Sequence, residues 1–265
     1  RCSPTFQILR HEEFAEGCKA QCNGPYDGKW SKTMVGYGSE DSHFVLELTY
    51  NYGVGSYKMG NDIQSAFERI QGGVWPSSNV SPDTLQVESP GGYCFMVHNR
   101  EPEGDPVQMV ALSVTNLRRS IEYWSEWCGM EIVFSCSSEA VLQFAPDQCQ
   151  LKLIAINQPV DHASAFGRIA FSCPRSQLMD LENLMKNENQ KILKHLVSLD
   201  TPGKATVEVI ILADPDGHEI CFVGDEAFRE LSRIDPKADE ILTDAIQSDK
   251  SDEWFDKKRG GKAQQ

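Results

Sequence analysis

Alternating apolar and polar positions predict a recurring order of elements in the later part of the chain: a strand, a helix and three more strands. The first copy is predicted as a strand at 109–114, a helix capped by Asn116 and ended by Gly129, and strands at 130–136, 140–144 and 151–156. Residues 109–114 alternate with period two, whereas the apolar positions of the helix recur every three or four residues.

The same order restarts after Gly167. The predicted elements are a strand at 169–173, a helix with Leu178, Leu181 and Met185 on its apolar face, and strands at 195–199, 206–212 and 218–223. The run Asp214-Pro215-Asp216-Gly217 is a strong turn signal between the last two strands.

The N-terminal part contains two less complete copies, which are the first and second modules of the chain. The copies at 109–156 and 169–223 are therefore the third and fourth modules. Strands at 7–11, 33–37 and 44–50 read as the last three of one unit, and strands at 85–88 and 93–97 as the last two of another. No opening strand is evident for this second unit, and residues 63–70 favour a short helix.

At 265 residues the chain is long enough for one or two domains with a core. We predict an α+β fold with a truncated first domain at 1–100 and a polar, proline-containing linker at 101–106. A second domain follows at 107–224. A helical C-terminal extension completes the chain at 225–265, and its end, from Lys257, is predicted to be disordered.

The charge balance narrows the classes of partner. There are 25 Lys and Arg against 39 Asp and Glu, a formal net charge of −14. Nucleic acids and anionic membrane surfaces are both bound through clustered basic residues. The negative charge therefore argues against both partners. Separately, no apolar run reaches the roughly 18 residues of a membrane-spanning helix.

Nine cysteines are present, with no C-x-x-C pair. Several lie in apolar runs, as reduced buried thiols do, which indicates a reducing compartment inside the cell, cytoplasm or mitochondrion. Cys18 and Cys22 are four residues apart. Free thiols are the favoured interpretation of this pair, and a metal or disulfide pair is the alternative.

Two motifs carry a resemblance to a known family. The run Glu47-Leu48-Thr49-Tyr50-Asn51 resembles the E-L-T-x-N segment of glyoxalase I, and Asp214 to Ile220 matches its D-P-D-G-x-x-I turn. The chain is thus identified as a member of the vicinal oxygen chelate superfamily, from about Leu9 to Val223. This resemblance implies paired strand-helix-three-strand modules that form cup-shaped mixed sheets, with the N-terminal modules incomplete.

The resemblance also implies positions for a metal. In metal-using members each module offers a ligand, commonly His, from its first strand and a Glu from its last. Here only Glu47 is retained, and the other positions identified hold Met96, Met109, Lys152, Arg168 and Cys221. A catalytic ion needs about three protein ligands and an open position, and cationic side chains repel it. The site is therefore predicted to be degenerate, and a Zn, Ni, Mn or Fe cofactor is the disfavoured alternative.

Other candidate residues have competing interpretations. Asn51 matches the Asn that contacts glutathione in glyoxalase I, or it is a turn residue that ends its strand. His43, His162 and His218 are predicted to be surface or turn histidines. No Ser-His-Asp, P-loop or dinucleotide pattern is present.

These residues lead to two functional hypotheses. If the third and fourth modules form one cup, Lys152 and Arg168 could hold a small anion such as a carboxylate or phosphate, or they pair with acids such as Glu208 or Glu219. A glutathione-like ligand is the other candidate partner, and it would contact Asn51. The first hypothesis is a non-catalytic binding or regulatory protein. The alternative is a metal-dependent glyoxalase-type lyase or oxygenase that uses Glu47, with missing ligands supplied from elsewhere, for instance in a homo-oligomer. Whether the chain is a shortened form stays open.

Overall fold

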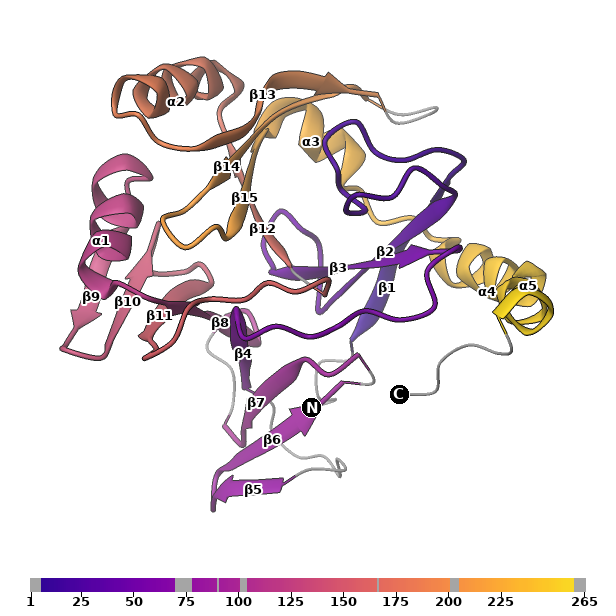
Figure 1. The fold of residues 1–265 in the computed structure, drawn as a ribbon, viewed down its shortest axis with the longest axis horizontal. Helices are drawn as coiled ribbons and strands as arrows, with labels where there is room; N and C mark the ends of the chain where they lie inside the picture. The colour runs from indigo at the N-terminus through magenta and orange to yellow at the C-terminus, as the bar shows by residue number, and fades with distance from the viewer. Residues whose placement is uncertain are drawn as a thin grey trace. The chain divides into compact units, whose positions relative to one another are not determined.

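The computed structural model describes residues 6–69, 78–89, 91–100, 104–165, 167–200 and 205–259 (Figure 1). They form two compact units. The larger unit comprises the described residues of 59–228, and the smaller unit combines 6–58 with 229–259. The predicted domain boundaries at 100 and 107 stay a prediction, and residues 101–103 of the expected linker lie outside the described residues.

An eight-stranded mixed sheet dominates the larger unit (Figure 1). Its spatial order is β5 (Ser78–Ser81), β6 (Thr84–Glu88), β7 (Cys94–His98), β4 (Ile63–Arg69), β8 (Val107–Val114), β11 (Gln150–Ala155), β10 (Glu139–Gln143) and β9 (Glu131–Ser135). In each half the opening strand lies parallel to the closing one, β4 to β7 and β8 to β11. The two halves join through the antiparallel pair of β4 and β8. Repeated modules in a mixed sheet, as predicted, are therefore confirmed.

The prediction of a helix at 63–70 was wrong. Residues 63–69 form β4, the opening strand that had not been recognised, while residue 70 lies outside the described residues. Gln64, Ala66 and Glu68 favour a helix locally, but hydrogen-bonding partners on both sides impose an extended backbone. Tertiary pairing thus overrides local propensity in this segment.

The third module follows its predicted order. Helix α1 (Leu117–Glu122) begins where the Asn116 side chain accepts a hydrogen bond from the Arg119 amide at 3.1 Å. A π-helical turn, η1 (Tyr123–Trp127), continues it. Gly129 then adopts a φ of +82°, a conformation that glycine tolerates at a helix end.

The fourth module forms a separate four-stranded sheet. Its order is β12 (Arg168–Cys173), β15 (Glu219–Gly224), β14 (Val207–Ala213) and β13 (Ile192–Leu199), with α2 (Arg175–Asn187) packed against it. Helix α3 (Asp225–Leu231) follows. The hypothesis that modules three and four form one cup is therefore wrong in one respect: their strands do not belong to one sheet. Strand β8 of module three pairs instead with β4 of module two. The two modules still share one apolar core, which includes Leu112, Trp124, Leu142, Leu178, Ile210 and Phe222.

The smaller unit combines three strands with the C-terminal helices. Strands β1 (Gln7–Phe14), β2 (Trp30–Gly36) and β3 (Val45–Asn51) pair antiparallel in that order. Helix α4 (Ala238–Ser248) packs against β1, and α5 (Ser251–Arg259) follows. The helical extension is therefore confirmed. The predicted disorder from Lys257 is wrong for 257–259, which end α5, and residues 260–265 lie outside the described residues.

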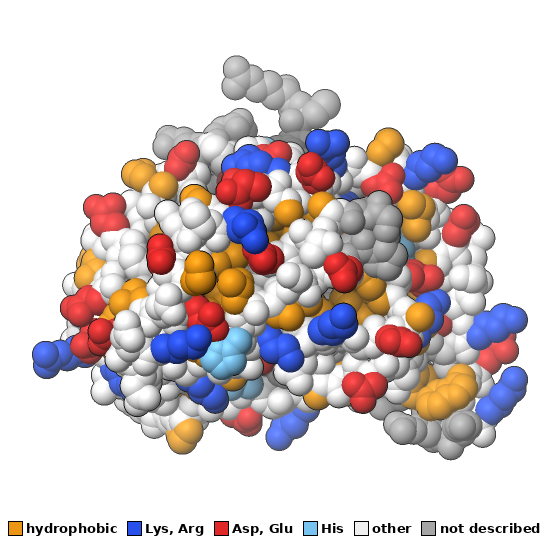
Figure 2. Space-filling model, turned by 90° about the horizontal axis from the view of Figure 1, so that it is seen from above, with side chains coloured by type: hydrophobic (Ala, Val, Ile, Leu, Met, Phe, Trp, Pro, Cys, Tyr) orange, Lys and Arg blue, Asp and Glu red, His pale blue; other side chains and the backbone are white. Residues whose placement is uncertain are grey.

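Two further observations bear on the classes of partner. In the part of the chain that the structure describes, no helix combines the length and apolarity needed to cross a membrane. Acidic and basic side chains are interspersed over the face shown in Figure 2.

The shared core predicts a test of stability. Leu142 is fully buried, so Leu142→Ala should lower the free energy of unfolding by about 2–5 kcal/mol through lost burial and a cavity. Met179 is 60% exposed, so Met179→Ala should change the free energy of unfolding by less than about 0.5 kcal/mol. Urea unfolding monitored by tryptophan fluorescence compares the two, and equal losses would contradict the assignment of the core.

Candidate functional site

Strand β4 supplies the first-strand position that was unassigned in the second module. Met109 lies two residues before Ala111, the register partner of Lys152. By the same offset, Ser65 lies two residues before Phe67, the register partner of Met96. The four equivalent positions of this sheet are therefore Ser65, Met96, Met109 and Lys152, and none is a His, Asp or Glu.

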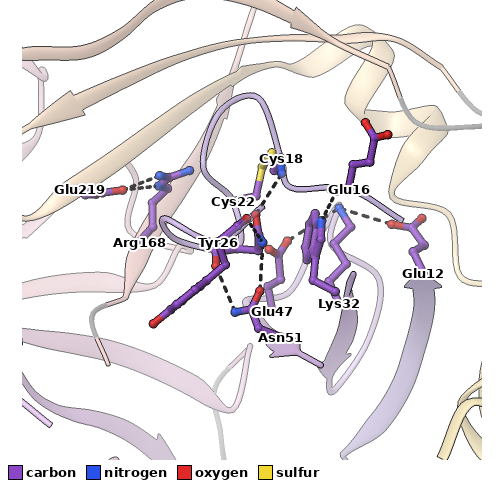
Figure 3. Close-up of a disulfide and its surroundings, with 12 residues drawn as sticks. Glu12, Glu16, Cys18, Cys22, Tyr26, Lys32, Glu47, Asn51, Arg168 and Glu219 are labelled. Carbon is purple, nitrogen blue, oxygen red and sulfur yellow. Dashed lines mark hydrogen bonds and ion pairs between the residues drawn. A yellow bond between two sulfur atoms is a disulfide. The ribbon is translucent and has the colours of Figure 1, made fainter. Parts of the chain in front are cut away.

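Lys152 and Arg168 both have carboxylate partners. The Lys152 ammonium lies 2.7 Å from Glu139, and the Arg168 Nε donates to Glu219 at 2.8 Å (Figure 3). All four side chains are partly buried. Both cations therefore form ion pairs, which was the alternative to anion binding. Arg168 pairs with Glu219, as predicted, whereas Glu208 pairs with Arg175. Anion binding by Lys152 and Arg168 stays a prediction.

Glu47 lies on a charged face of the three-stranded sheet in the smaller unit. Its carboxylate is 3.9 Å from the Lys32 ammonium, which also lies 3.3 Å from Glu12 (Figure 3). Arg10, nearly fully buried on this face, pairs with Glu40 at 2.5 Å. In these contacts the charged neighbour of Glu47 is Lys32. A cation at this place opposes the binding of a metal ion by Glu47.

Asn51 is buried at the end of β3, where it holds a loop in place. Its amide donates to the Asn23 carbonyl at 3.1 Å and to the Tyr57 hydroxyl at 2.8 Å, and its side-chain oxygen accepts from Asn23 at 2.9 Å. These bonds use its amide nitrogen twice and its oxygen once. They support the structural interpretation, and a glutathione contact stays a prediction.

The free-thiol interpretation of Cys18 and Cys22 was wrong. The two side chains form a disulfide within the loop that Asn23 and Asn51 hold (Figure 3). Four-residue spacing alone could not decide this, because pairing depends on how the loop brings the two Cβ atoms together. The other cysteines within the described residues form no disulfide: Cys94, Cys128, Cys136, Cys149, Cys173 and Cys221.

The described residues contain one group of three side chains that could bind a metal: Asp62, His162 and His218. Each can offer a ligand atom within 4.8 Å of the other two. His218 is only 5% exposed, so it is not a surface residue, although it closes the predicted turn, where the Asp214 backbone N–H donates to its carbonyl at 3.0 Å. The group was missed because its members are far apart in the sequence, and Asp62 precedes a strand that was not recognised.

Hydrogen bonds orient both imidazole rings. His162 Nδ1 lies 3.0 Å from the Asp62 carboxylate, and its Nε2 lies 3.0 Å from the Asp216 carbonyl oxygen. His218 Nε2 lies 2.7 Å from the Ser113 carbonyl oxygen. The hydrogen bond to Asp62 and the one to the Asp216 carbonyl raise the pKa of His162, while burial opposes the rise.

This raised pKa predicts a pH-dependent contribution to stability. Because the folded-state pKa of His162 lies above its ordinary value of 6.5, the stabilisation is fully present below that value. It is lost as the pH rises through the folded-state pKa. The loss of unfolding free energy in His162→Gln should therefore be larger at about pH 5.5 than at about pH 9. Urea unfolding at both pH values measures it, and a loss that grows with pH would contradict the assignment.

Comparisons with known proteins agree with this architecture. The family described as glyoxalase domain-containing protein 4-like, C-terminal domain, matches residues 116–231. Maize glyoxalase I superposes with a TM-score of 0.69 at 20% identity, covering 85% of this chain and 86% of the maize chain. The fold is therefore that of glyoxalase I.

Two curated relatives match nearly the whole chain. Glyoxalase domain-containing protein 4 of Rattus norvegicus is 60% identical over 259 residues, covering 94% of this chain and 87% of the relative. Glyoxalase 1 of Caenorhabditis elegans is 45% identical over 256 residues, covering 94% and 90%. With identity of this extent and the shared fold, the chain belongs to the glyoxalase domain-containing protein 4 family.

Proposed function

We propose that the chain is a glyoxalase-like binding or regulatory protein whose inherited metal site is degenerate. The observation that carries the proposal is the set of side chains at the four ligand positions of the eight-stranded sheet: Ser65, Met96, Met109 and Lys152. Thioethers are soft ligands, poorly suited to Zn, Ni or Mn, and an ammonium repels a cation. These positions therefore favour a function that needs no metal there.

Small anions are the proposed ligand class. Lys152 and Arg168 lie on separate sheets, so each is proposed to donate charge-assisted hydrogen bonds to its own carboxylate or phosphate. An incoming anion must compete with Glu139 at Lys152 and with Glu219 at Arg168. A glutathione-like ligand is a specific form of this proposal, because a relative in Arabidopsis thaliana is named as a probable lactoylglutathione lyase. Binding is expected to be weak unless the ligand displaces the internal carboxylates.

The other parts of the proposal rest on charge and thiols. A formal net charge of −14 and interspersed surface charges (Figure 2) favour neither nucleic acid nor an anionic membrane as a partner. Six described cysteines form no disulfide, against one disulfide pair, Cys18 with Cys22, and this excess of thiols favours a reducing compartment, cytoplasm or mitochondrion.

The alternative is a metal-dependent glyoxalase-type lyase or oxygenase that uses Glu47. One observation favours it: the relative named Glyoxalase 1 in Caenorhabditis elegans is 45% identical over most of its length. The chemistry would be metal polarisation of two neighbouring substrate oxygens. It requires Glu47 to exchange Lys32 for further ligands, for instance from a second copy of the chain.

An activity assay separates the two functions. We expect no turnover of a 2-oxoaldehyde–glutathione adduct above the rate without protein, in the presence of Zn²⁺, Ni²⁺, Mn²⁺ or Fe²⁺. Turnover is monitored by absorbance of the thioester product, with a glyoxalase I enzyme as positive control. Metal-dependent turnover that disappears in Glu47→Gln would overturn the proposal in favour of the lyase.

Anion binding has its own test with matched variants. Lys152→Ala should abolish calorimetrically detected binding of S-alkyl glutathione or phosphate, whereas Glu139→Gln should strengthen it because the competing carboxylate is lost. Lys186→Ala removes an ammonium from the surface of α2 and should leave binding unchanged. Equal binding by all these variants would remove Lys152 from the proposal.

A further inference from the structure

We propose that Asp62, His162 and His218, none of which is a ligand position of the glyoxalase family, bind one divalent transition-metal ion of the zinc or ferrous type. The three residues come from different segments of the larger unit. Asp62 precedes β4, His162 lies between β11 and β12, and His218 precedes β15. Folding thus brings two nitrogen ligands and one oxygen ligand within 4.8 Å of one another.

The hydrogen bonds of the two rings carry the inference. A carbonyl oxygen can only accept, so His218 Nε2 must donate to Ser113 and His162 Nε2 to Asp216. Each neutral ring then keeps its lone pair on Nδ1. Histidines that bind metals usually donate their other ring N–H to a backbone carbonyl or a carboxylate, which sets the tautomer and orients the ring. Both rings have this arrangement.

The contact between His162 and Asp62 is stabilised by a positive charge. In the tautomer set by Asp216, Nδ1 of His162 presents a lone pair to the Asp62 carboxylate at 3.0 Å. Two electron-pair donors at this distance require a positive charge between or beside them, either a proton or a metal ion. The experiment below separates these two occupants.

The surrounding backbone is built to hold the three ligands in place. The backbone N–H of Asn61 donates to the Asp161 carbonyl at 2.8 Å, and the backbone N–H of Ser113 donates to the Asp62 carbonyl at 2.8 Å. Gly60 is required at this junction, because a Cβ there would lie 1.9 Å from the Asp161 oxygen. Such fixed supports keep ligand side chains close to a binding geometry before the ion arrives.

The donor set and its burial indicate the class of ion. Two imidazoles and one carboxylate suit Zn²⁺ and Fe²⁺ better than Ca²⁺ or Mg²⁺, which prefer oxygen ligands. Asp62 and His218 are 3% and 5% exposed, whereas His162 is partly exposed and leaves an approach from solvent. Three protein ligands also leave a coordination position for water or a substrate oxygen.

Titration of chelator-treated protein with Zn²⁺, and with Co²⁺ as a spectroscopic probe, tests the inference. We expect one ion per chain by calorimetry, with His162→Gln and Asp62→Asn weakening the affinity by about 100-fold or more. His195→Gln is the matched control, because His195 is exposed on β13 and pairs with Glu182. This control should bind Zn²⁺ like the unmodified chain.

Two outcomes would overturn the site. One is the absence of saturable Zn²⁺ binding, which would leave a proton between His162 and Asp62. The other is binding that His162→Gln does not weaken. Because Asp62 and His218 are buried and their variants can misfold, X-ray absorption of the unmodified zinc complex provides an independent test, and fewer than two imidazole ligands would contradict the inference.

The same titration keeps this inference separate from the proposed function. If the unmodified chain shows lyase turnover and Glu47→Gln loses zinc binding, the proposed function is overturned. Loss in His162→Gln but not in Glu47→Gln would support the new site and leave the proposed function standing.

Discussion

The antiparallel pairing of β4 with β8 is the constraint on which the larger unit depends. It joins two modules into one eight-stranded sheet and places both opening strands at its centre. A central strand has hydrogen-bonding partners on both sides, so its backbone has little freedom to adopt another structure. The locations of Ser65 and Met109 relative to one another follow from this pair, and the pairing of β8 with β11 adds Lys152.

Each charged residue at the family positions has an oppositely charged neighbour. Lys152 pairs with Glu139, Arg168 with Glu219, and Glu47 lies near Lys32. A partly buried charge that lacks a partner is costly, which explains why cations on these strands have acids beside them. The same pairing reduces the affinity for any outside ligand, because a ligand must first displace a partner already in place.

The histidine cluster is satisfied differently. Its rings donate to the backbone carbonyls of Ser113 and Asp216, which are parts of the fold and do not move as side chains do. Fixed acceptors set the tautomers of His162 and His218 and direct their lone pairs. This distinction separates the two candidate regions of the chain: internal ion pairs at the family positions, and imidazole rings oriented by the backbone at the cluster.

Periodicity alone was sufficient for the third and fourth modules, because each contains an amphipathic helix between alternating strands and carries its own caps and turns, such as Asn116 and Gly217. The motif at Glu47 to Asn51 was likewise sufficient for the superfamily. Only the tertiary structure decided the state of β4, because helix-favouring residues there are overridden by strands that pair with it from distant parts of the sequence. The same holds for the disulfide of Cys18 with Cys22 and for the meeting of Asp62, His162 and His218. Contacts of this kind depend on where the chain returns in space, which local residue patterns do not specify.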